Sequence, residues 1–166
     1  MDLLVREVQL DDAEAIVGIL NPIIAAEVYT AFTTPFTVEA EREYILHFPQ
    51  HGVFHVAVCR HEQKIVGFQS MEPFATYTHA FDHVGVLGTY VSLPYRRQNI
   101  GRSLFKATFE AARCKGYEKL LTFVRADNVA ALATYLNQGF HIVGRAQRQA
   151  KSNGMYVDEI IIERFL

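Results

Sequence analysis

A basic turn, residues 91–104, has the residue types and spacing best suited to specific chemistry in this sequence. It leads from an apolar run into a helical pattern and contains Arg96, Arg97, Asn99, Gly101 and Arg102. The first N–H groups of a helix lack partners within it, and the helix dipole is positive there, so such a junction favours an anion. Gly101 permits close backbone approach, and Asn99 tolerates a left-handed conformation. The turn therefore predicts a phosphate or pyrophosphate site, with a solvated helix start as the structural alternative.

Eleven predicted elements surround this turn. Apolar runs predict strands over residues 3–8, 53–60, 65–74, 83–91, 119–124, 141–148 and 155–163. Predicted helices start at an Asp11/Glu14 capping box, Thr37, Ile100 and Asn128, and end at Asn21-Pro22, before Pro49, at Gly116 and at Gly139. The order predicts an α/β (α+β) fold: a mixed, mostly antiparallel sheet of about seven strands with four flanking helices and one helical crossover. A length of 166 residues predicts a single domain, residues 1–166.

Composition limits the classes of partner. Sixteen Lys and Arg residues oppose 18 Asp and Glu residues, giving a net charge of -2, which argues against a nucleic-acid-binding protein. No apolar stretch approaches the roughly 18 residues of a membrane span, and the first residues lack the order of a signal peptide. We therefore expect a soluble, cytoplasmic protein without a membrane partner.

The motif Arg96-x-x-Asn99-x-Gly101 after a strand resembles the Arg/Gln-x-x-Gly-x-Gly/Ala loop of the GNAT N-acetyltransferase superfamily. The order of elements agrees along nearly the whole chain. The resemblance implies acetyl-CoA as cosubstrate, its pantetheine arm paired with the backbone of a strand and its pyrophosphate held by the loop. The implied strand residues are Thr89, Tyr90 and Val91, and the implied loop residues are Arg96, Arg97, Gln98, Asn99, Ile100, Gly101, Arg102 and Ser103. Asn99 replaces the first glycine of the family motif.

A second motif, Asn128-x-x-Ala131-x-x-x-Tyr135-x-x-x-Gly139-Phe140, is similar to the family's Asn-x-x-Ala-x-x-x-Tyr-x-x-x-Gly-Phe. By resemblance, Asn128 binds the cofactor and Tyr135 protonates the departing CoA thiolate. The chemistry is consistent, because a tyrosine of pKa about 10 can donate to a thiolate whose conjugate acid has a pKa of about 8.5. A plain N-cap and a plain core aromatic are the structural alternatives.

Within the superfamily, the segments 65–74 and 90–92 most resemble the phosphinothricin and methionine sulfoximine acetyltransferase branch. That branch carries a glutamate five residues before the position of Val91, where this sequence has Val86. A general base is nevertheless needed, because deprotonating a lysine-like amine at pH 7 costs about 4 to 5 kcal/mol. Substitute bases lie in predicted loops and at strand ends, where structural or solvated roles are the alternatives: Glu27, Glu72, His79, Asp82 and His83.

The sequence thus predicts an acetyl-CoA-dependent N-acetyltransferase in which an amine attacks the thioester directly in a ternary complex. A backbone N–H near Val91 is expected to hold the oxyanion. The expected acceptor is a small-molecule amine, an amino acid or an analogue such as phosphinothricin or methionine sulfoximine, with aromatic residues of segments 25–37 and 74–81 around it. A protein or peptide N-terminal acetyltransferase and a non-catalytic CoA-binding sensor are the alternatives, and the family makes a homodimer possible.

Metal and thiol chemistry are not predicted. His47, His51 and His55 recur at every fourth position, but Pro49 and Gly52 interrupt any helix that could align them. The two cysteines, Cys59 and Cys114, form no paired motif and are expected to be reduced structural thiols.

Overall fold

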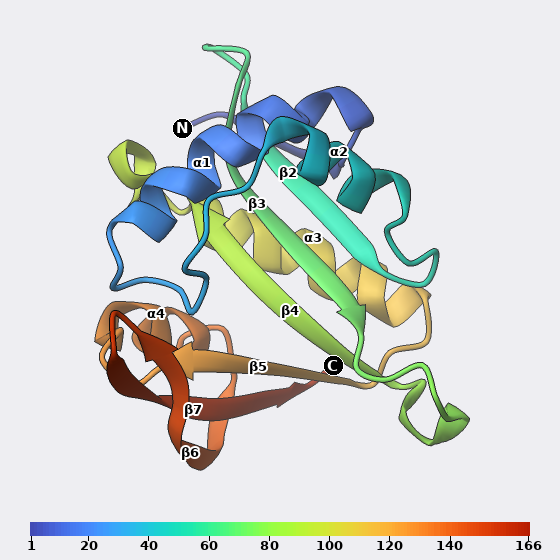
Figure 1. Ribbon diagram of the computed structural model, residues 1–166. Coiled ribbons are helices and arrows are strands. Elements are labelled where there is room, and N and C mark those ends of the chain that lie inside the picture. The colour runs from blue at the N-terminus through green and yellow to red at the C-terminus, as the bar shows by residue number, and fades with distance from the viewer.

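The computed structural model describes residues 1–166, which form one seven-stranded sheet of order β1-β2-β3-β4-β5-β7-β6 (Figure 1). Only β4 and β5 are parallel, and every other neighbouring pair is antiparallel. The strands are β1 (Leu3–Glu7), β2 (Val53–Cys59), β3 (Lys64–Pro73), β4 (Val84–Val91), β5 (Lys119–Arg125), β6 (His141–Ser152) and β7 (Met155–Phe165). The α-helices are α1 (Ala13–Ala25), α2 (Val38–Leu46), α3 (Ile100–Cys114) and α4 (Val129–Leu136). The predicted fold class is confirmed.

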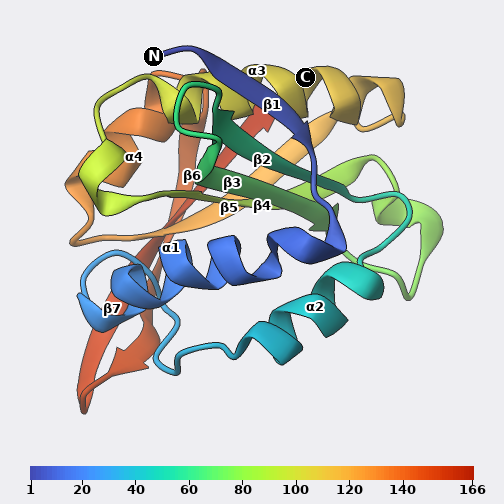
Figure 2. The ribbon, with the colours of Figure 1, turned by 90° about the horizontal axis from the view of Figure 1, so that it is seen from above.

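The helices cover the sheet in two layers, with α1 and α2 on one face and α3 and α4 on the other (Figure 2). Phe54 and Phe68 pack with the apolar side of α1 on the first face. Phe105, Tyr135 and Phe140 form the centre of the core on the second face. Each strand residue can therefore be assigned to one face, and this assignment determines which side chains meet in the site. None of the helices is both long enough and apolar enough to cross a membrane.

Most predicted boundaries agree with the structure to within a few residues. Asn99 has a φ of 63° at the N-cap of α3, and Gly116 and Gly139 have φ of 86° and 83° just after the ends of α3 and α4. These are the left-handed positions that the sequence predicted. The predicted crossover is α3, which joins the parallel strands β4 and β5.

The predicted end of the first helix at Asn21-Pro22 is wrong, because α1 continues to Ala25 with Pro22 inside it. Proline removes one helical hydrogen bond. Two effects offset that loss: Ile23 and Ile24 become buried against the sheet, and the Asn21 amide exchanges two 2.9 Å hydrogen bonds with the backbone of Phe36.

The predicted Asp11/Glu14 capping box is also wrong. The reciprocal box joins Gln9 and Asp12, at the short 3-10 turn that precedes α1. Asp12 accepts from the Gln9 backbone N–H at 2.7 Å and from the Arg6 guanidinium at 2.6 and 2.8 Å. The guanidinium and the N–H together hold the pKa of Asp12 below its usual value, although burial opposes them.

Candidate active site

The parallel strands β4 and β5 form a fork. They pair only from Val84 to Val86, opposite Lys119 to Leu121, and then diverge, as Figure 1 shows. At the point of divergence the Thr122 hydroxyl donates a 2.6 Å hydrogen bond to the Leu87 carbonyl. Beyond it, the edge of β4 that faces β5 has no strand partner.

Alternation along β4 determines which backbone groups face the fork. Phe74 N–H bonds to Val84 C=O and Ser92 N–H bonds to Val66 C=O, so even-numbered residues of β4 direct their backbone toward β3. The N–H and C=O groups of Thr89 and Val91 consequently face the gap. Tyr90 directs its backbone toward β3 and borders the fork with its side chain instead. The fork therefore offers an extended ligand one row of strand hydrogen bonds from Thr89 and Val91.

The basic turn lies at the open end of the fork. None of the N–H groups from Arg97 to Arg102 donates a hydrogen bond within the protein, and the first that does is Ser103, to the Asn99 carbonyl at 3.1 Å. Arg97 and Asn99 both have positive φ, 61° and 63°, which turns successive N–H groups toward one side. A Cβ added at Gly101 would meet no atom within 4 Å. The turn is a cradle of free donors beside open space.

A cleft of about 840 Å³ runs from this cradle along β4 to α4. Of the sequence-predicted cofactor residues, ten border it: Thr89, Tyr90, Val91, Arg96, Arg97, Asn99, Ile100, Gly101, Arg102 and Asn128. Gln98 and Ser103 do not. Three guanidinium groups and a row of free N–H groups make this a site for an anionic, elongated molecule.

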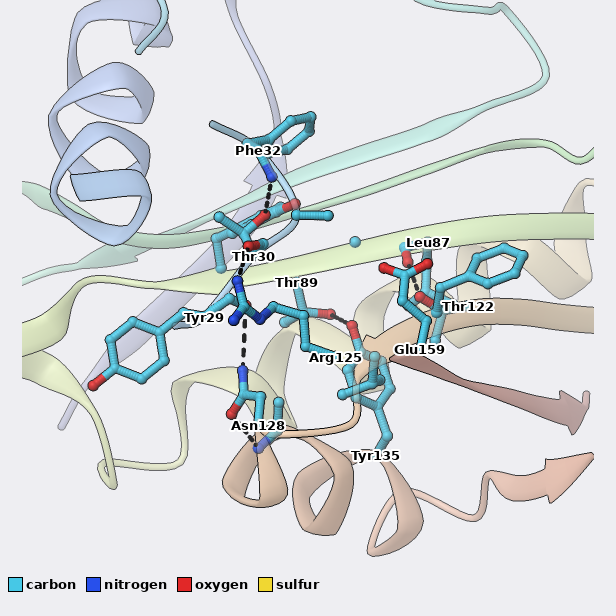
Figure 3. Close-up of a pocket in the computed structure, with 16 residues that line it drawn as sticks. Tyr29, Thr30, Phe32, Leu87, Thr89, Thr122, Arg125, Asn128, Tyr135 and Glu159 are labelled. Carbon is cyan, nitrogen blue, oxygen red and sulfur yellow. Dashed lines mark hydrogen bonds between the residues drawn. The ribbon is translucent and has the colours of Figure 1, made fainter. Parts of the chain in front are cut away.

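Tyr135 lies where the cleft meets the fork. Its hydroxyl donates to Thr89 Oγ1 at 3.1 Å, and the Gln69 amide donates to the same oxygen at 2.7 Å (Figure 3 shows the first bond). Burial raises the pKa of Tyr135, although hydrogen bonding with Thr89 and Thr122 opposes the shift. Tyr135 therefore keeps its proton throughout the neutral range and is held on the α3/α4 face of the fork.

The segment between α1 and α2 forms a roof over the fork. The Arg125 guanidinium donates to the carbonyls of Glu27 at 2.8 Å and Thr30 at 3.1 Å, and it is paired with Asp127 at 2.7 Å. The Asn128 amide donates to Tyr29 C=O at 3.2 Å while its Oδ1 caps α4 (Figure 3). Asn128 is therefore an N-cap, as one alternative expected, and also borders the cleft.

Beneath this roof, a second cavity of about 210 Å³ fills the gap between the diverging strands. Tyr29, Phe32 and Tyr90 border it on the α1/α2 side. Burial raises the pKa of Tyr90 to about 12. The carboxylate of Glu159, from β7, also lines it (Figure 3). The cavity is small, partly apolar and adjacent to Tyr135, which suits a small reactant.

The predicted bases lie outside this cavity. Glu72 is directly opposite Val86 across β3 and β4, on the α1/α2 face, and accepts a hydrogen bond from Tyr44 of α2. His83 is exposed at the start of β4, at the closed end of the fork. The structure does not bring His83 together with Tyr135.

The other three predicted bases, His79, Asp82 and Glu27, are held in surface contacts. His79 lies 2.9 Å from Asp82 on an exposed turn, and Glu27 accepts a 2.5 Å hydrogen bond from Asn153. None of these three residues lines the cavity.

Four residues of the site were not found by sequence reasoning: Gln69, Thr122, Arg125 and Glu159. Gln69 and Thr122 are buried polar residues next to apolar ones in their strands, and a polar residue at a buried strand position is a signal that could have marked them. Arg125 and Glu159 are neighbours across β5 and β7, but they lie 34 positions apart in the sequence and belong to no motif. Only the strand register brings them together.

Gln69 fixes the hydroxyl to which Tyr135 donates, so we expect Gln69→Leu to lower kcat about three- to tenfold with an unchanged KM for acetyl-CoA. The side chain is fully buried and its Oε1 has no partner, so removing the whole amide should change the melting temperature little. Kinetics and thermal unfolding measure both effects. In a Thr89→Val background the Gln69→Leu change should have no further effect on kcat, and additive losses would contradict the coupling.

A mixed sheet that splits beside a helical crossover, with a basic helix start at the open end, defines an N-acetyltransferase class of fold. The model of the acetyltransferase (GNAT) family matches residues 24–140. The chain therefore belongs to the acetyltransferase (GNAT) family and is an enzyme of the N-acetyltransferase class, which confirms the resemblance inferred from the Arg96 and Asn128 motifs.

Proteins similar to this chain are also named as acetyltransferases. A phosphinothricin N-acetyltransferase of Streptomyces coelicolor is 24% identical over 156 residues, covering 93% of this chain and 91% of that protein. A GNAT superfamily phosphinothricin acetyltransferase from Sinorhizobium meliloti, solved in complex with acetyl-CoA, has a TM-score of 0.87 at 19% identity and covers 100% of this chain and 89% of its own. A ribosomal-protein-alanine N-acetyltransferase from Brucella melitensis has a TM-score of 0.90 at 24% identity, covering 98% and 99%. The last two establish the fold alone.

Proposed function

We propose that this protein transfers the acetyl group of acetyl-CoA to the amine of a small molecule, an amino acid or an analogue such as phosphinothricin, by direct attack in a ternary complex. The observation that carries the proposal is the fork. Its unpaired β4 edge runs from the cradle of free N–H groups at residues 97–102 to the Tyr135 hydroxyl.

The residues present fit acetyl-CoA. The cradle of N–H groups and the side chains of Arg96, Arg97 and Arg102 would hold the pyrophosphate. Thr89 and Val91 would pair with the amides of the pantetheine arm, as a missing strand would. Acetyl-CoA bound in this way would have its thioester in the gap between β4 and β5, next to Tyr135.

At that position the chain supplies two of the groups that acyl transfer needs. A backbone N–H of β4 facing the gap, expected from sequence to lie near Val91, would stabilise the oxyanion. Tyr135 would protonate the departing thiolate, because its hydroxyl borders the gap and keeps its proton at physiological pH. Holding both reactants in one small cavity would supply much of the rate.

The size of the cavity favours a small acceptor. A volume of about 210 Å³ beneath the roof segment suits a compact amine better than an extended peptide. The name of the Streptomyces coelicolor relative, phosphinothricin N-acetyltransferase, also supports a small acceptor. The Brucella enzyme named for a ribosomal protein shares the fold at a TM-score of 0.90, so the fold by itself does not select between these acceptors.

Thiol release from acetyl-CoA tests the proposal. We would assay the purified protein with L-phosphinothricin, L-methionine sulfoximine, the proteinogenic amino acids, simple mono- and diamines and a peptide with a free N-terminal alanine. Turnover of a small amine, with the peptide at least tenfold poorer in kcat/KM, is expected. Preference for the peptide would favour the N-terminal acetyltransferase, and acetyl-CoA binding without turnover of any amine would favour the sensor.

A further inference from the structure

We propose that Glu159 of β7 is the general base that takes a proton from the acceptor amine. This role rests on the proposed function and concerns a residue outside the matched family segment, residues 24–140. Three observations carry it: the face on which Glu159 lies, its position in the cavity and its lack of a partner.

Strand register places Glu159 on the acceptor side. Val124 and Ile160 are neighbours in the core on the α3/α4 face, so the next pair along, Arg125 and Glu159, lies on the α1/α2 face. That is the face on which the roof segment and the ring of Tyr90 enclose the cavity. Glu159 therefore faces the space in which a small amine would lie.

Tyr135 lies on the opposite side of the same gap. It belongs to the α3/α4 core and reaches the gap from below, whereas Glu159 enters from the side of the roof segment (Figure 3). An amine that attacks a thioester held between the strands would approach from one side while the sulfur faces the other. The protein thus holds a proton acceptor and a proton donor on opposite faces of the split sheet, as the reaction requires.

The Glu159 carboxylate makes no hydrogen bond or ion pair within the protein, although Arg125 is its neighbour on β5. The Arg125 guanidinium instead forms an ion pair with Asp127 and donates hydrogen bonds to the carbonyls of Glu27 and Thr30 in the roof segment. Burial raises the pKa of Glu159, and the charge of Arg125 opposes that shift. The other titratable groups lining the cavity, Tyr29, Tyr90 and Tyr135, come from the roof, β4 and α4. A free carboxylate with a raised pKa is better matched to proton abstraction near neutrality than an ordinary glutamate.

Glu72, the carboxylate nearest to Val86, is less suited to this task. It does not line the cavity, and the Tyr44 hydroxyl already donates to it.

The proton transfers balance. Glu159 takes one proton from the ammonium, and the nitrogen lone pair then forms the C–N bond to the thioester carbon. The C–S bond breaks with its electron pair on sulfur, and Tyr135 gives its proton to the thiolate. The second proton lost from nitrogen restores the Tyr135 hydroxyl, and the proton on Glu159 passes to solvent. The products are the N-acetyl amide, the CoA thiol and one proton.

The test compares pH–rate profiles of Glu159→Gln, Glu159→Asp and Glu72→Gln, using the assayed amine with the highest kcat/KM. In the wild type, kcat/KM should rise as the Glu159 carboxyl loses its proton. In Glu159→Gln this rise in the pH–rate profile should be absent, and kcat/KM at pH 7 should be about 100-fold lower than in the wild type. The difference should shrink as the pH approaches the pKa of the amine. Glu159→Asp should restore part of the rate.

A matched control is Glu163→Gln, on the same strand and face but paired with Lys119 and His141 outside the cavity; it should keep the wild-type profile. Calorimetry with acetyl-CoA should give the same Kd for all variants. An unchanged profile in Glu159→Gln, or loss of the rise in Glu72→Gln alone, overturns the role of Glu159 while the wild-type turnover still supports the proposed function. A wild type that turns over no amine overturns both.

Discussion

Gly101→Val is expected to weaken acetyl-CoA binding about 100-fold while leaving the fold intact. Gly101 lies in the first turn of α3, and a Cβ there would meet no protein atom within 4 Å. The valine would therefore project into the space where the proposed pyrophosphate lies and keep it from the N–H groups of the cradle. Losing one or two hydrogen bonds to a charged group, at roughly 1.5–3 kcal/mol each, accounts for the size of the effect. Isothermal calorimetry with acetyl-CoA measures it.

Gly18→Val is the matched control. Gly18 lies in the exposed part of α1, outside the cleft, and a Cβ there also meets nothing within 4 Å. Valine has a somewhat higher helix propensity than glycine at both sites, so neither melting temperature should fall. If Gly101→Val and Gly18→Val bind acetyl-CoA equally well, the cradle is not the pyrophosphate site.

Tyr135→Phe is expected to lower kcat by about 100- to 1000-fold with a Kd for acetyl-CoA within twofold of the wild type. The change removes only the hydroxyl, which makes its contact with Thr89, and leaves the ring packed against Phe105 and Phe140. General acid catalysis contributes this order of magnitude. Because burial raises the pKa of Tyr135, the wild type should also keep its activity to pH values at which an ordinary tyrosine begins to ionise.

Tyr117→Phe provides the control for a lost buried hydroxyl. Tyr117 is part of the same core, and its hydroxyl donates a 3.1 Å hydrogen bond to the His51 carbonyl, away from the fork. Both variants should lose roughly 1 kcal/mol of stability, whereas only Tyr135→Phe should lose turnover. Normal turnover in Tyr135→Phe would show that water or another group protonates the thiolate.

Local signals made the fold predictable from the sequence. Gly116, Gly139 and Asn99 occupy the left-handed positions that their residue types favour, and the apolar periods between them set the elements. The predicted end of α1 at Pro22 was wrong because two effects offset the lost helical hydrogen bond. Two isoleucines beyond Pro22 are buried, and the side-chain amide of Asn21 forms hydrogen bonds with the backbone of Phe36. Tertiary packing decided that boundary.

In the candidate site, too, some residues could be predicted from local sequence and others depend on tertiary structure. The cradle and Tyr135 belong to continuous motifs, so the order of residues along the chain was enough to predict them. Glu159 does not, because its position depends on the register of β7 against β5 and on the divergence of β5 from β4. The cross-strand neighbour of a residue can be predicted only when the partner strand and its register are known. The sequence does not give this partner, because β7 follows β6 in the chain but lies between β5 and β6 in the sheet.

Because of the fork, main-chain N–H and C=O groups would make most of the proposed contacts with the cofactor. Thr89 and Val91 offer the same N–H and C=O groups whatever side chains they carry, so the register of one unpaired strand edge, and not residue identity, selects a partner with regularly spaced amides. Enzymes built on such an edge can exchange the side chains around it, and with them the acceptor, while the acyl donor stays the same. Only proline, which has no N–H to offer, would be excluded at these two positions.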